Sequence, residues 1–303
     1  MLTHIKRCIY LLFLKAIKSE NIKNYQMMKE IFSPFFKFKK QYKEEIDFLK
    51  KRKNITMFPY PFIEKYKCND IEVYRDEDVQ MYYVLHMGKK LYYPSEMTEN
   101  AVKATYRGIL LEQDQDSPHR YFSAGYEFEQ DGIFIDVGCA EANMALEVVD
   151  KAQKVLLFEA DKRWMPALMA TFAPYRDKVT IINKYAGEKE CEGQTTIDTE
   201  IRAIDETILD KAYSNQVYIK IDAEGSELTV LNGASQLMQT KRVMCACCTY
   251  HRREDAELFS SFFTDLGYQY EYSKGYAIFK ASKELEYPYF RRCLLRTKNF
   301  EIV

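Results

Sequence analysis

Hydrophobic and polar residues alternate along the second half of the chain in a pattern that predicts a β-sheet with helices between its strands. Short apolar runs indicate strands at residues 133–137, 155–159, 179–183, 217–222, 243–249, 268–272 and 275–280. Apolar residues at helical spacing lie between them, near residues 142–152, 162–173, 225–239 and 254–266. The last two strands are joined by a tight turn at Ser273, Lys274 and Gly275. We therefore predict an α/β fold with a seven-stranded, mostly parallel sheet and an antiparallel last strand.

The first 118 residues follow a different pattern. Apolar residues at helical spacing predict two or three amphipathic helices in residues 1–53. In residues 54–118, the segments MYYVLH, GKK and LYYP predict a β-hairpin, and Ser95 is the expected N-cap of a helix over residues 96–113. We thus expect an N-terminal helical segment at 1–53, a connector with a hairpin and a helix at 54–118, and the main domain at 119–303.

Charge is distributed unevenly along the chain. Residues 1–60 hold 14 Lys or Arg and 5 Asp or Glu, whereas residues 61–303 hold 30 Lys or Arg and 40 Asp or Glu. The basic, aromatic-containing segment 1–53 suggests docking to a membrane surface or a protein partner, and a solvated helical segment with no partner is the alternative. Basic tails are not specific for nucleic acid, and we expect none.

Two further features bear on location. The apolar run from Ile9 to Leu14 is far shorter than the ~20 residues of a membrane span, and no small-residue cleavage site follows it. The eight cysteines include no CxxC pair, which argues against a zinc site and favours reduced, buried thiols. These features predict a cytoplasmic protein, either free or peripheral to the inner face of a membrane.

Acidic residues follow the strand at 217–222. The segment VYIKIDAEGSELTVL places Asp222 and Glu224 directly after an apolar run, with Glu227 in the expected first helical turn. In open α/β sheets, ligands bind outside the carboxyl ends of the strands. Asp222 and Glu224 are therefore expected to contact a substrate or cofactor, while Glu227 is expected to be a first-turn acid favoured by the helix dipole.

A second group of strand-end residues lies in GIFIDVGCAEANMAL and VLLFEAD. Asp136 and Gly138 end one strand, and Glu159 and Asp161 end the next. This is the layout of a nucleoside-binding α/β half, in which a tight turn approaches the ligand and an acid accepts hydrogen bonds from ribose hydroxyls. Alanine replaces two glycines of the dinucleotide pattern, at positions 140 and 142, which disfavours a pyrophosphate and an NAD-dependent oxidoreductase. A ligand without phosphate, such as S-adenosylmethionine, fits better.

The segments FIDVGCAEANMAL, LLFEAD and YIKIDAEGSELTVLNGA, in this order and spacing, resemble the FkbM-type family of class I S-adenosylmethionine-dependent methyltransferases. The resemblance covers roughly residues 119–280 and is most specific at KIDAEGSE. It implies a Rossmann-like domain, S-adenosylmethionine as the cofactor, and O-methylation of a sugar or polysaccharide precursor or of a secondary metabolite. The chain departs from the family at Ala142, where glycine is usual, and alanine restricts positive φ.

The resemblance also implies a cofactor-binding set. Asp136 and Gly138 would position the methionine end, Glu159 would accept from both ribose hydroxyls, and Asp161 and the Tyr185–Ala186 segment would border the adenine. The remaining predicted cofactor-binding residues belong to the same turns: Ala140, Glu141, Asn143 and Ala160.

Three residues are predicted to be catalytic. Asp222 and Glu224 would lie beside the transferred methyl, where carboxylates can orient the acceptor, stabilise the sulfonium or ligate a divalent ion; no motif indicates a metal. His251, after a sheet strand, is expected to be a general base or an acceptor contact. His119 could fold over the cofactor or belong to a linker.

The alternative function is a catalytically weakened methyltransferase-like domain that binds a partner or membrane, and a homo-oligomer is compatible with both functions.

Overall fold

The computed structural model describes residues 22–52, 54–204, 216–279 and 287–301, which belong to two compact units. Unit 1 takes in residues up to 63 together with 276–291, and unit 2 takes in residues 64–275 together with 292–303. The domain boundaries predicted at residues 53 and 118 stay a prediction.

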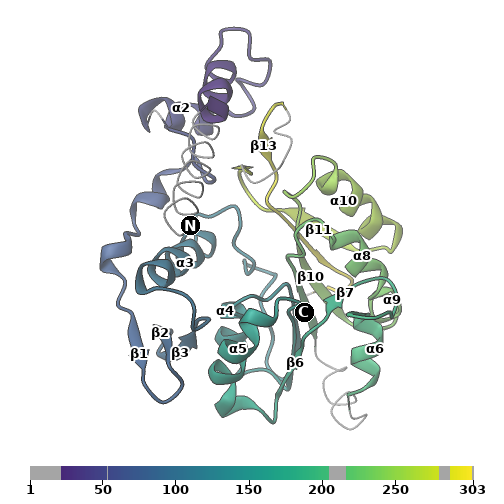
Figure 1. The fold of residues 1–303 in the computed structure, drawn as a ribbon. Helices are drawn as coiled ribbons and strands as arrows, with labels where there is room; N and C mark the ends of the chain where they lie inside the picture. The colour runs from purple at the N-terminus through teal and green to yellow at the C-terminus, as the bar shows by residue number, and fades with distance from the viewer. Residues whose placement is uncertain (1–21, 53, 205–215, 280–286, 302–303) are drawn as a thin grey trace, which may run out of the picture. The chain divides into compact units, whose positions relative to one another are not determined.

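Unit 2 is built around a seven-stranded sheet with the strand order β11-β14-β10-β9-β4-β5-β6 (Figure 1). The pairs β10·β9, β9·β4, β4·β5 and β5·β6 are parallel, and β14 is antiparallel to both β10 and β11. The predicted fold class is confirmed. The strands are β4 Ile133–Val137, β5 Lys154–Phe158, β6 Val179–Ile182, β9 Val217–Ile221, β10 Val243–Cys248, β11 Gln269–Tyr272 and β14 Leu294–Lys298.

The antiparallel strand is not the one that the sequence predicted. Within the predicted strand 275–280, the described residues up to 279 contain the short strand β12 (Ala277–Ile278), which pairs with β13 (Phe290–Arg291) in unit 1. The place in the sheet belongs to β14, where Leu294 and Leu295 are fully buried. The charged residue Arg296 interrupts the apolar run of this strand, so the sequence pattern did not predict a buried strand here. Its buried guanidinium donates to the carbonyl oxygens of Arg120 and Tyr121 instead of reaching solvent.

Helices pack on the sheet through apolar residues. One large core cluster joins Ile135, Ile219 and Leu156 to Leu231 and Phe263 of the helices. The helices of this region are α4 Asn143–Val148, η3 Lys162–Trp164, α5 Met165–Thr171, η4 Ala173–Tyr175, α6 Ile197–Arg202, α8 Glu227–Asn232, α9 Ser235–Thr240 and α10 Asp255–Asp265. In Figure 1, α6, α8, α9 and α10 lie on the same side of the sheet.

The helix predicted at 225–239 is split into α8 and α9. Gly233 lies between them, and a Cβ there would come within 1.8 Å of the carbonyl oxygen of Gly187. The Gly233 carbonyl accepts a hydrogen bond from the amide of Asp198, outside either helix. This close approach of a distant segment coincides with the Asn232–Gly233 pair, a helix-end signal that the prediction of one continuous helix passed over.

The hairpin and helix ahead of the sheet are confirmed with shifted bounds. Strands β2 (Met81–His86) and β3 (Lys89–Tyr92) pair antiparallel, with β1 (Tyr74–Asp76) beside β2. Met87 and Gly88 have φ angles of 50° and 80°, as a two-residue hairpin turn requires. Helix α3 spans Glu99–Glu112, and its N-cap is Thr98, whose hydroxyl accepts from the amide of Ala101; the prediction of Ser95 was wrong. The short elements are η1 Pro61–Glu64, η2 Cys68–Asp70, β7 Tyr185–Ala186 and β8 Gln194–Thr195.

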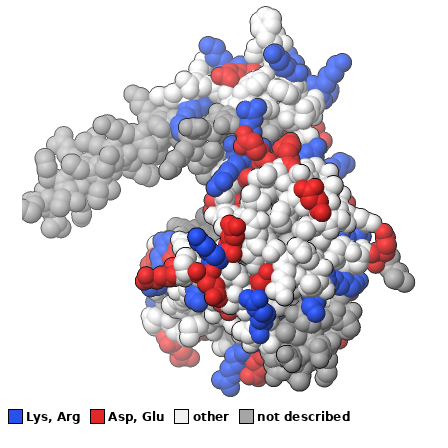
Figure 2. Space-filling model, turned by 90° about the vertical axis from the view of Figure 1, so that its right-hand side faces the viewer, with Lys and Arg blue, Asp and Glu red and all other residues white. Residues whose placement is uncertain are grey.

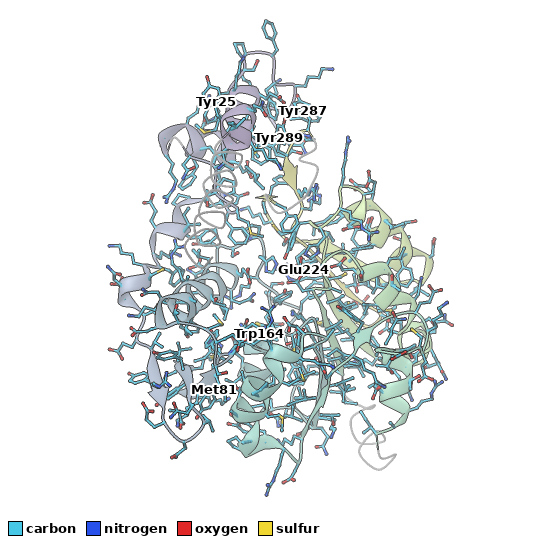
Figure 3. The ribbon with its side chains drawn as sticks, viewed as in Figure 1. Tyr25, Met81, Trp164, Glu224, Tyr287 and Tyr289 are labelled. Atoms are coloured by element: carbon cyan, nitrogen blue, oxygen red, sulfur yellow. The ribbon has the colours of Figure 1, made fainter. Side chains whose placement is uncertain are left out.

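Trp164 belongs to a small satellite core. It packs with Met81, Tyr92 and Ala167, and its ring centroid lies 6.2 Å from that of Tyr93 (Figure 3). Its role in the structure is therefore packing.

Unit 1 is assembled from segments far apart in the sequence. Residues 22–31 are helical, α2 spans Lys43–Arg52, and the β12–β13 pair comes from the other end of the chain. Ile31, Ile46, Leu49, Ile278 and Phe290 share one buried cluster. The aromatic residues Tyr25, Tyr287 and Tyr289 of this unit are labelled in Figure 3, and the Tyr289 hydroxyl donates to Glu30. The apolar stripe predicted at residues 5–17 lies outside the described residues.

The distribution of charge on the surface and the length of the helices bear on the predicted docking to a membrane or a partner. On the face drawn in Figure 2, basic and acidic side chains are interspersed. Among the described residues, no helix has both the length and the apolar character needed to cross a membrane. Docking through residues 1–53 stays a prediction.

Candidate active site

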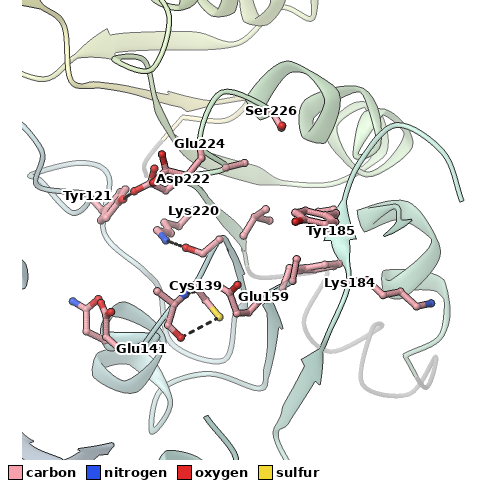
Figure 4. A pocket seen from close by; sticks show the side chains of 18 of the residues that line it. Tyr121, Cys139, Glu141, Glu159, Lys184, Tyr185, Lys220, Asp222, Glu224 and Ser226 are labelled. Atoms are coloured by element: carbon pink, nitrogen blue, oxygen red, sulfur yellow. Dashed lines mark hydrogen bonds between the residues drawn. The ribbon is translucent and has the colours of Figure 1, made fainter. Parts of the chain in front are cut away.

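A cavity of about 490 Å³ opens at the carboxyl ends of β4, β5 and β9 in unit 2 (Figure 4). This is the edge of an open α/β sheet at which ligands bind, and the volume is typical of small-molecule sites. Most of the predicted site residues line it: Gly138, Ala140, Glu141, Asn143, Glu159, Ala160, Tyr185, Ala186, Asp222 and Glu224. Asp136, Asp161 and His251 do not.

Gly138 brings the turn after β4 into contact with the end of β9. Its φ angle is +66°, and a Cβ at this position would lie 1.9 Å from the carbonyl oxygen of Asp222. The amide of Gly138 donates to the carbonyl of Phe158 at the end of β5, which ties the turn to the neighbouring strand. Only glycine satisfies both the backbone angle and the close approach.

The two alanines of this turn adopt the backbone conformation that usually favours glycine. Ala140 has a φ angle of 45° and Ala142 of 58°, both in the left-handed region. Such a conformation costs an L-residue about 1–2 kcal/mol. Ala142 is fully buried and precedes α4, and its amide donates to the carbonyl of Cys139 at 2.6 Å. The alanine at this position therefore leaves the shape of the turn intact.

Glu159 is held at the end of β5 by backbone amides. Its Oε2 accepts from the amide of Ala140 at 2.9 Å, and its Oε1 accepts from the amide of Asp161 at 2.7 Å. Each carboxylate oxygen keeps a further lone pair, so the fixed carboxylate can still accept from a ligand in the cavity. Asp161 itself turns away from the cavity: it caps η3 and pairs with Arg163, which lowers the pKa of Asp161.

A buried lysine connects the first turn to β9. Lys220 Nζ lies 2.9 Å from Asp136 Oδ1 and donates to the carbonyl oxygen of Gly138 at 2.8 Å. Although burial disfavours its charge, the carboxylates of Asp136 and Asp222 raise the pKa of Lys220. The Asp136 carboxylate is thus paired with Lys220 and does not line the cavity. Lys220 lines the cavity, and the lysine inside the apolar run VYIKI was the sequence signal that could have identified it.

Asp222 is the centre of a polar cluster at the other end of the cavity. The Tyr121 hydroxyl donates to its Oδ2 at 3.0 Å and the Tyr250 hydroxyl to its Oδ1 at 3.4 Å. Burial alone would raise the pKa of Asp222, but Lys220, His119 and His251 hold it below its ordinary value. The carboxylate therefore stays ionised. His119 lies behind it, with Nε2 4.0 Å from Oδ2, and burial lowers the pKa of His119 to about 4.

His251 is oriented by Glu227 and faces the two predicted catalytic acids. Its Nδ1 lies 2.8 Å from Glu227 Oε1, and its Nε2 lies 3.5 Å from both Asp222 Oδ1 and Glu224 Oε2. Burial opposes the imidazolium, but Glu227 and Asp222 raise the pKa of His251. The structure thus brings all three predicted catalytic residues together, although the His251 side chain does not line the cavity.

Glu227 lies at the predicted position in the helix but in a different environment. It begins α8, as predicted for a first-turn acid, but it is fully buried. Its Oε1 accepts from the amides of Ala223 and Gly225 as well as facing His251. Glu227 therefore fixes both the loop after β9 and the imidazole.

Two half-buried acids in the cavity have raised pKa values. Burial, followed by the neighbouring carboxylates, raises the pKa of Glu112 to about 8, and burial raises that of Glu141 to about 7. Sequence reasoning missed Glu112 and Tyr121, because they reach the cavity from α3 and the segment after it, far from any strand-end motif.

Comparisons with known proteins agree on one class. Residues 142–270 match the family model described as Methyltransferase FkbM domain. A stretch of 66 residues is 39% identical to Ribosomal RNA small subunit methyltransferase A of Staphylococcus haemolyticus (strain JCSC1435), covering 22% of each chain. The chain thus spans about a fifth of that curated relative.

Solved structures are similar at lower identity. The structure of Methyltransferase FkbM from Methylobacillus flagellatus KT is 20% identical, with 66% of this chain and 53% of that chain covered and a TM-score of 0.43. Precorrin-6y C5,15-methyltransferase from Geobacter metallireducens GS-15 is 12% identical, with 58% and 85% covered and a TM-score of 0.37.

Proposed function

Since the chain belongs to the methyltransferase FkbM family through residues 142–270, we propose that it transfers a methyl group from S-adenosylmethionine to a hydroxyl group. The acceptor we propose is a sugar or polysaccharide precursor, or a secondary metabolite. The observation that carries the proposal is one cavity with an amide-held carboxylate, Glu159, at one end and the ionised Asp222 at the other.

The residues of the cavity fit this cofactor. Glu159 can accept from ribose hydroxyls through its remaining lone pairs. Asn143 lines the cavity, and its buried Nδ2 has no hydrogen-bond partner within the part of the chain that the structure describes, so it can donate to the methionine carboxylate. The raised pKa values of Glu112 and Glu141 suit a ligand that brings positive charge.

The cofactor would supply an activated methyl group on a positively charged sulfur. The chain's own residues then have two tasks, which are to hold the acceptor in line and to take a proton. Asp222 would accept a hydrogen bond from the acceptor hydroxyl and receive its proton as the methyl carbon bonds to the oxygen and leaves the sulfur, with the neutral thioether as the leaving group. Tyr121 and His251 would hold the Asp222 carboxylate in position while this occurs.

Calorimetry on the full chain with S-adenosylmethionine and with S-adenosylhomocysteine tests the cofactor directly. We expect both to bind. Absence of binding heat at millimolar concentration of either ligand would remove the basis of the proposal.

The Asp222→Ala and His251→Ala variants test the catalytic end of the cavity. We expect Asp222→Ala to lower turnover by about 100-fold and His251→Ala by about 10-fold, with cofactor affinity largely kept, because Asp222 would act on the acceptor and His251 would position Asp222. The measurement is S-adenosylhomocysteine release with an acceptor selected from hydroxylated sugars, alongside calorimetry. Unchanged rates in both variants would exclude these residues from the mechanism.

A further inference from the structure

The three predicted catalytic residues present their ligand atoms around one point. His251 Nε2 lies 3.5 Å from Asp222 Oδ1 and 3.5 Å from Glu224 Oε2, and all three ligand atoms lie within 4.8 Å of one another. In an octahedral site with bonds of about 2.1 Å, adjacent ligand atoms are about 3 Å apart. Small side-chain movements would therefore bring these atoms to the separation that a cation requires.

Glu227 orients the histidine as metal-binding histidines are oriented. A ligating imidazole nearly always donates its other N–H to a carboxylate or carbonyl, which leaves the second nitrogen unprotonated and directed at the metal. Glu227 Oε1 faces His251 Nδ1 at 2.8 Å, so Nε2 is the nitrogen directed toward Asp222 and Glu224. Because Glu227 also binds the amides on either side of Glu224, one buried residue organises two of the three candidate ligands.

The cluster also carries excess negative charge. Glu227 is fully buried, and its Oε2 has no hydrogen-bond partner among the residues that the structure describes. Asp222 and Glu224 add two more carboxylates within reach of one imidazole. Two cationic side chains lie nearby: Lys220 is engaged by Asp136 and the carbonyl of Gly138, and the Arg252 guanidinium lies beside Gly225. Burial of the Glu227 and Asp222 carboxylates is costly unless cations compensate for their charge.

We propose that Asp222, Glu224 and His251 bind one divalent cation of the Mg²⁺ or Mn²⁺ class at the acceptor end of the cavity. Two carboxylate oxygens and one imidazole suit such a cation. Three ligands on one side of an octahedron leave adjacent positions open, so an acceptor with two neighbouring oxygens, such as the vicinal hydroxyls of a sugar, could bind there. This acceptor class rests on the proposed methyl transfer, whereas cation binding does not.

Mn²⁺ titration of the full chain, followed by the electron paramagnetic resonance of free Mn²⁺, tests the site without any acceptor. We expect about one bound Mn²⁺ per chain and at least 10-fold weaker binding in Glu224→Gln and in Asp222→Asn. The nitrogen coupling of an imidazole ligand should appear in the spin-echo spectrum of bound Mn²⁺ and disappear in His251→Gln. Glu257→Gln, the same change at an exposed acid of α10, is the control and should bind Mn²⁺ normally.

Two results would overturn the proposal: no stoichiometric Mn²⁺ binding up to 1 mM, or equal affinity in Glu224→Gln and the control. The Glu224 side chain is 83% exposed, so this variant should fold even if Asp222→Asn does not. Calorimetry with S-adenosylmethionine on the same samples separates the two proposals. Cofactor binding without Mn²⁺ binding contradicts only the cation site, and Mn²⁺ binding without cofactor binding contradicts only the methyl transfer.

Discussion

Gly138 and Gly193 both have a left-handed backbone, at φ angles of +66° and +75°, but only Gly138 lacks room for a side chain. At Gly193 a Cβ would meet nothing within 4 Å, whereas at Gly138 it would lie 1.9 Å from the backbone of Asp222. We expect Gly193→Ala to lower the free energy of unfolding by about 1 kcal/mol, through the backbone angle alone. Gly138→Ala should cost at least ~2 kcal/mol more, because the end of β9 must move.

Urea unfolding of the two variants measures this difference, since the backbone angle is common to both. Cofactor calorimetry should show weaker binding in Gly138→Ala and unchanged binding in Gly193→Ala. Equal stability losses would mean that the close approach to Asp222 is not a constraint on the fold.

Individual site residues were predictable where a strand pattern identified them. Asp222, Glu224 and Glu159 follow apolar runs, so the sequence located them at the correct edge of the sheet. Glu112 ends the helix α3 and Tyr121 follows a polar segment, so no strand pattern identifies them, and their presence in the cavity depends on how α3 and the next segment pack. Ala142 was identified as a departure from the family, but only the structure shows that alanine adopts the required positive φ.

At the scale of elements, the junction of β9 and α8 depends on Glu227. This residue accepts two loop amides and faces His251 while fully buried, so Glu227→Ala should destabilise the fold by about 2–4 kcal/mol. Glu227→Gln keeps an acceptor oxygen for the amides and should recover part of that stability. Glu257→Ala, at an exposed position in α10, should change stability by less than about 0.5 kcal/mol.

Thermal or urea unfolding of the three variants provides the measurement, and proton resonances of His251 report its orientation. If Glu227 only stabilises the helix end, both substitutions should leave the His251 resonances unchanged. A role in positioning predicts that Glu227→Ala shifts them and that Glu227→Gln shifts them less.

Helices and strands with a clear local pattern of apolar residues were predicted correctly. Those that depend on contacts with distant segments were not. The five parallel strands of the seven-stranded sheet, β4, β5, β6, β9 and β10, were located within one residue at either end, because buried parallel strands are continuous apolar runs. β14 was missed because the buried Arg296 forms an ion pair with Glu271 and donates to the carbonyls of Arg120 and Tyr121, all of them distant in sequence. The break between α8 and α9 has a local signal in Asn232–Gly233, and the close approach of Gly187 from another segment accompanies it.

At the scale of the whole molecule, the two compact units divide the chain in a way that no local pattern indicates. Unit 1 joins Ile31 and Leu49 to Ile278 and Phe290 in one buried cluster, so the N-terminal region folds with a segment more than 200 residues later. Removal of residues 1–53 would therefore uncover apolar side chains of the β12–β13 pair. A test of docking through these residues is better made by substituting exposed lysines than by deletion.

The cavity gathers acids from separate elements, and this predicts how cofactor binding depends on pH. Glu112 comes from α3 and Glu141 from the turn before α4, and their pKa values are raised to about 8 and about 7. Without ligand, the folded chain holds protons that the unfolded chain loses above pH 4.5, so these groups make the fold less stable as pH rises toward 8. A bound cation favours the ionised carboxylates, and binding should therefore release protons.

We accordingly expect the affinity for S-adenosylmethionine to rise by about 5-fold to 10-fold between pH 6 and pH 8 and to level off above pH 8. S-adenosylhomocysteine lacks the sulfonium charge, so its affinity should rise less over the same range. Calorimetry at several pH values, in two buffers with different ionisation enthalpies, measures both the affinity and the number of protons released. Glu112→Gln and Glu141→Gln should each reduce the proton release, since glutamine cannot titrate. The same pH dependence for both ligands would show that these carboxylates do not sense the charge of the sulfur and lie outside the methyl-donor end of the site.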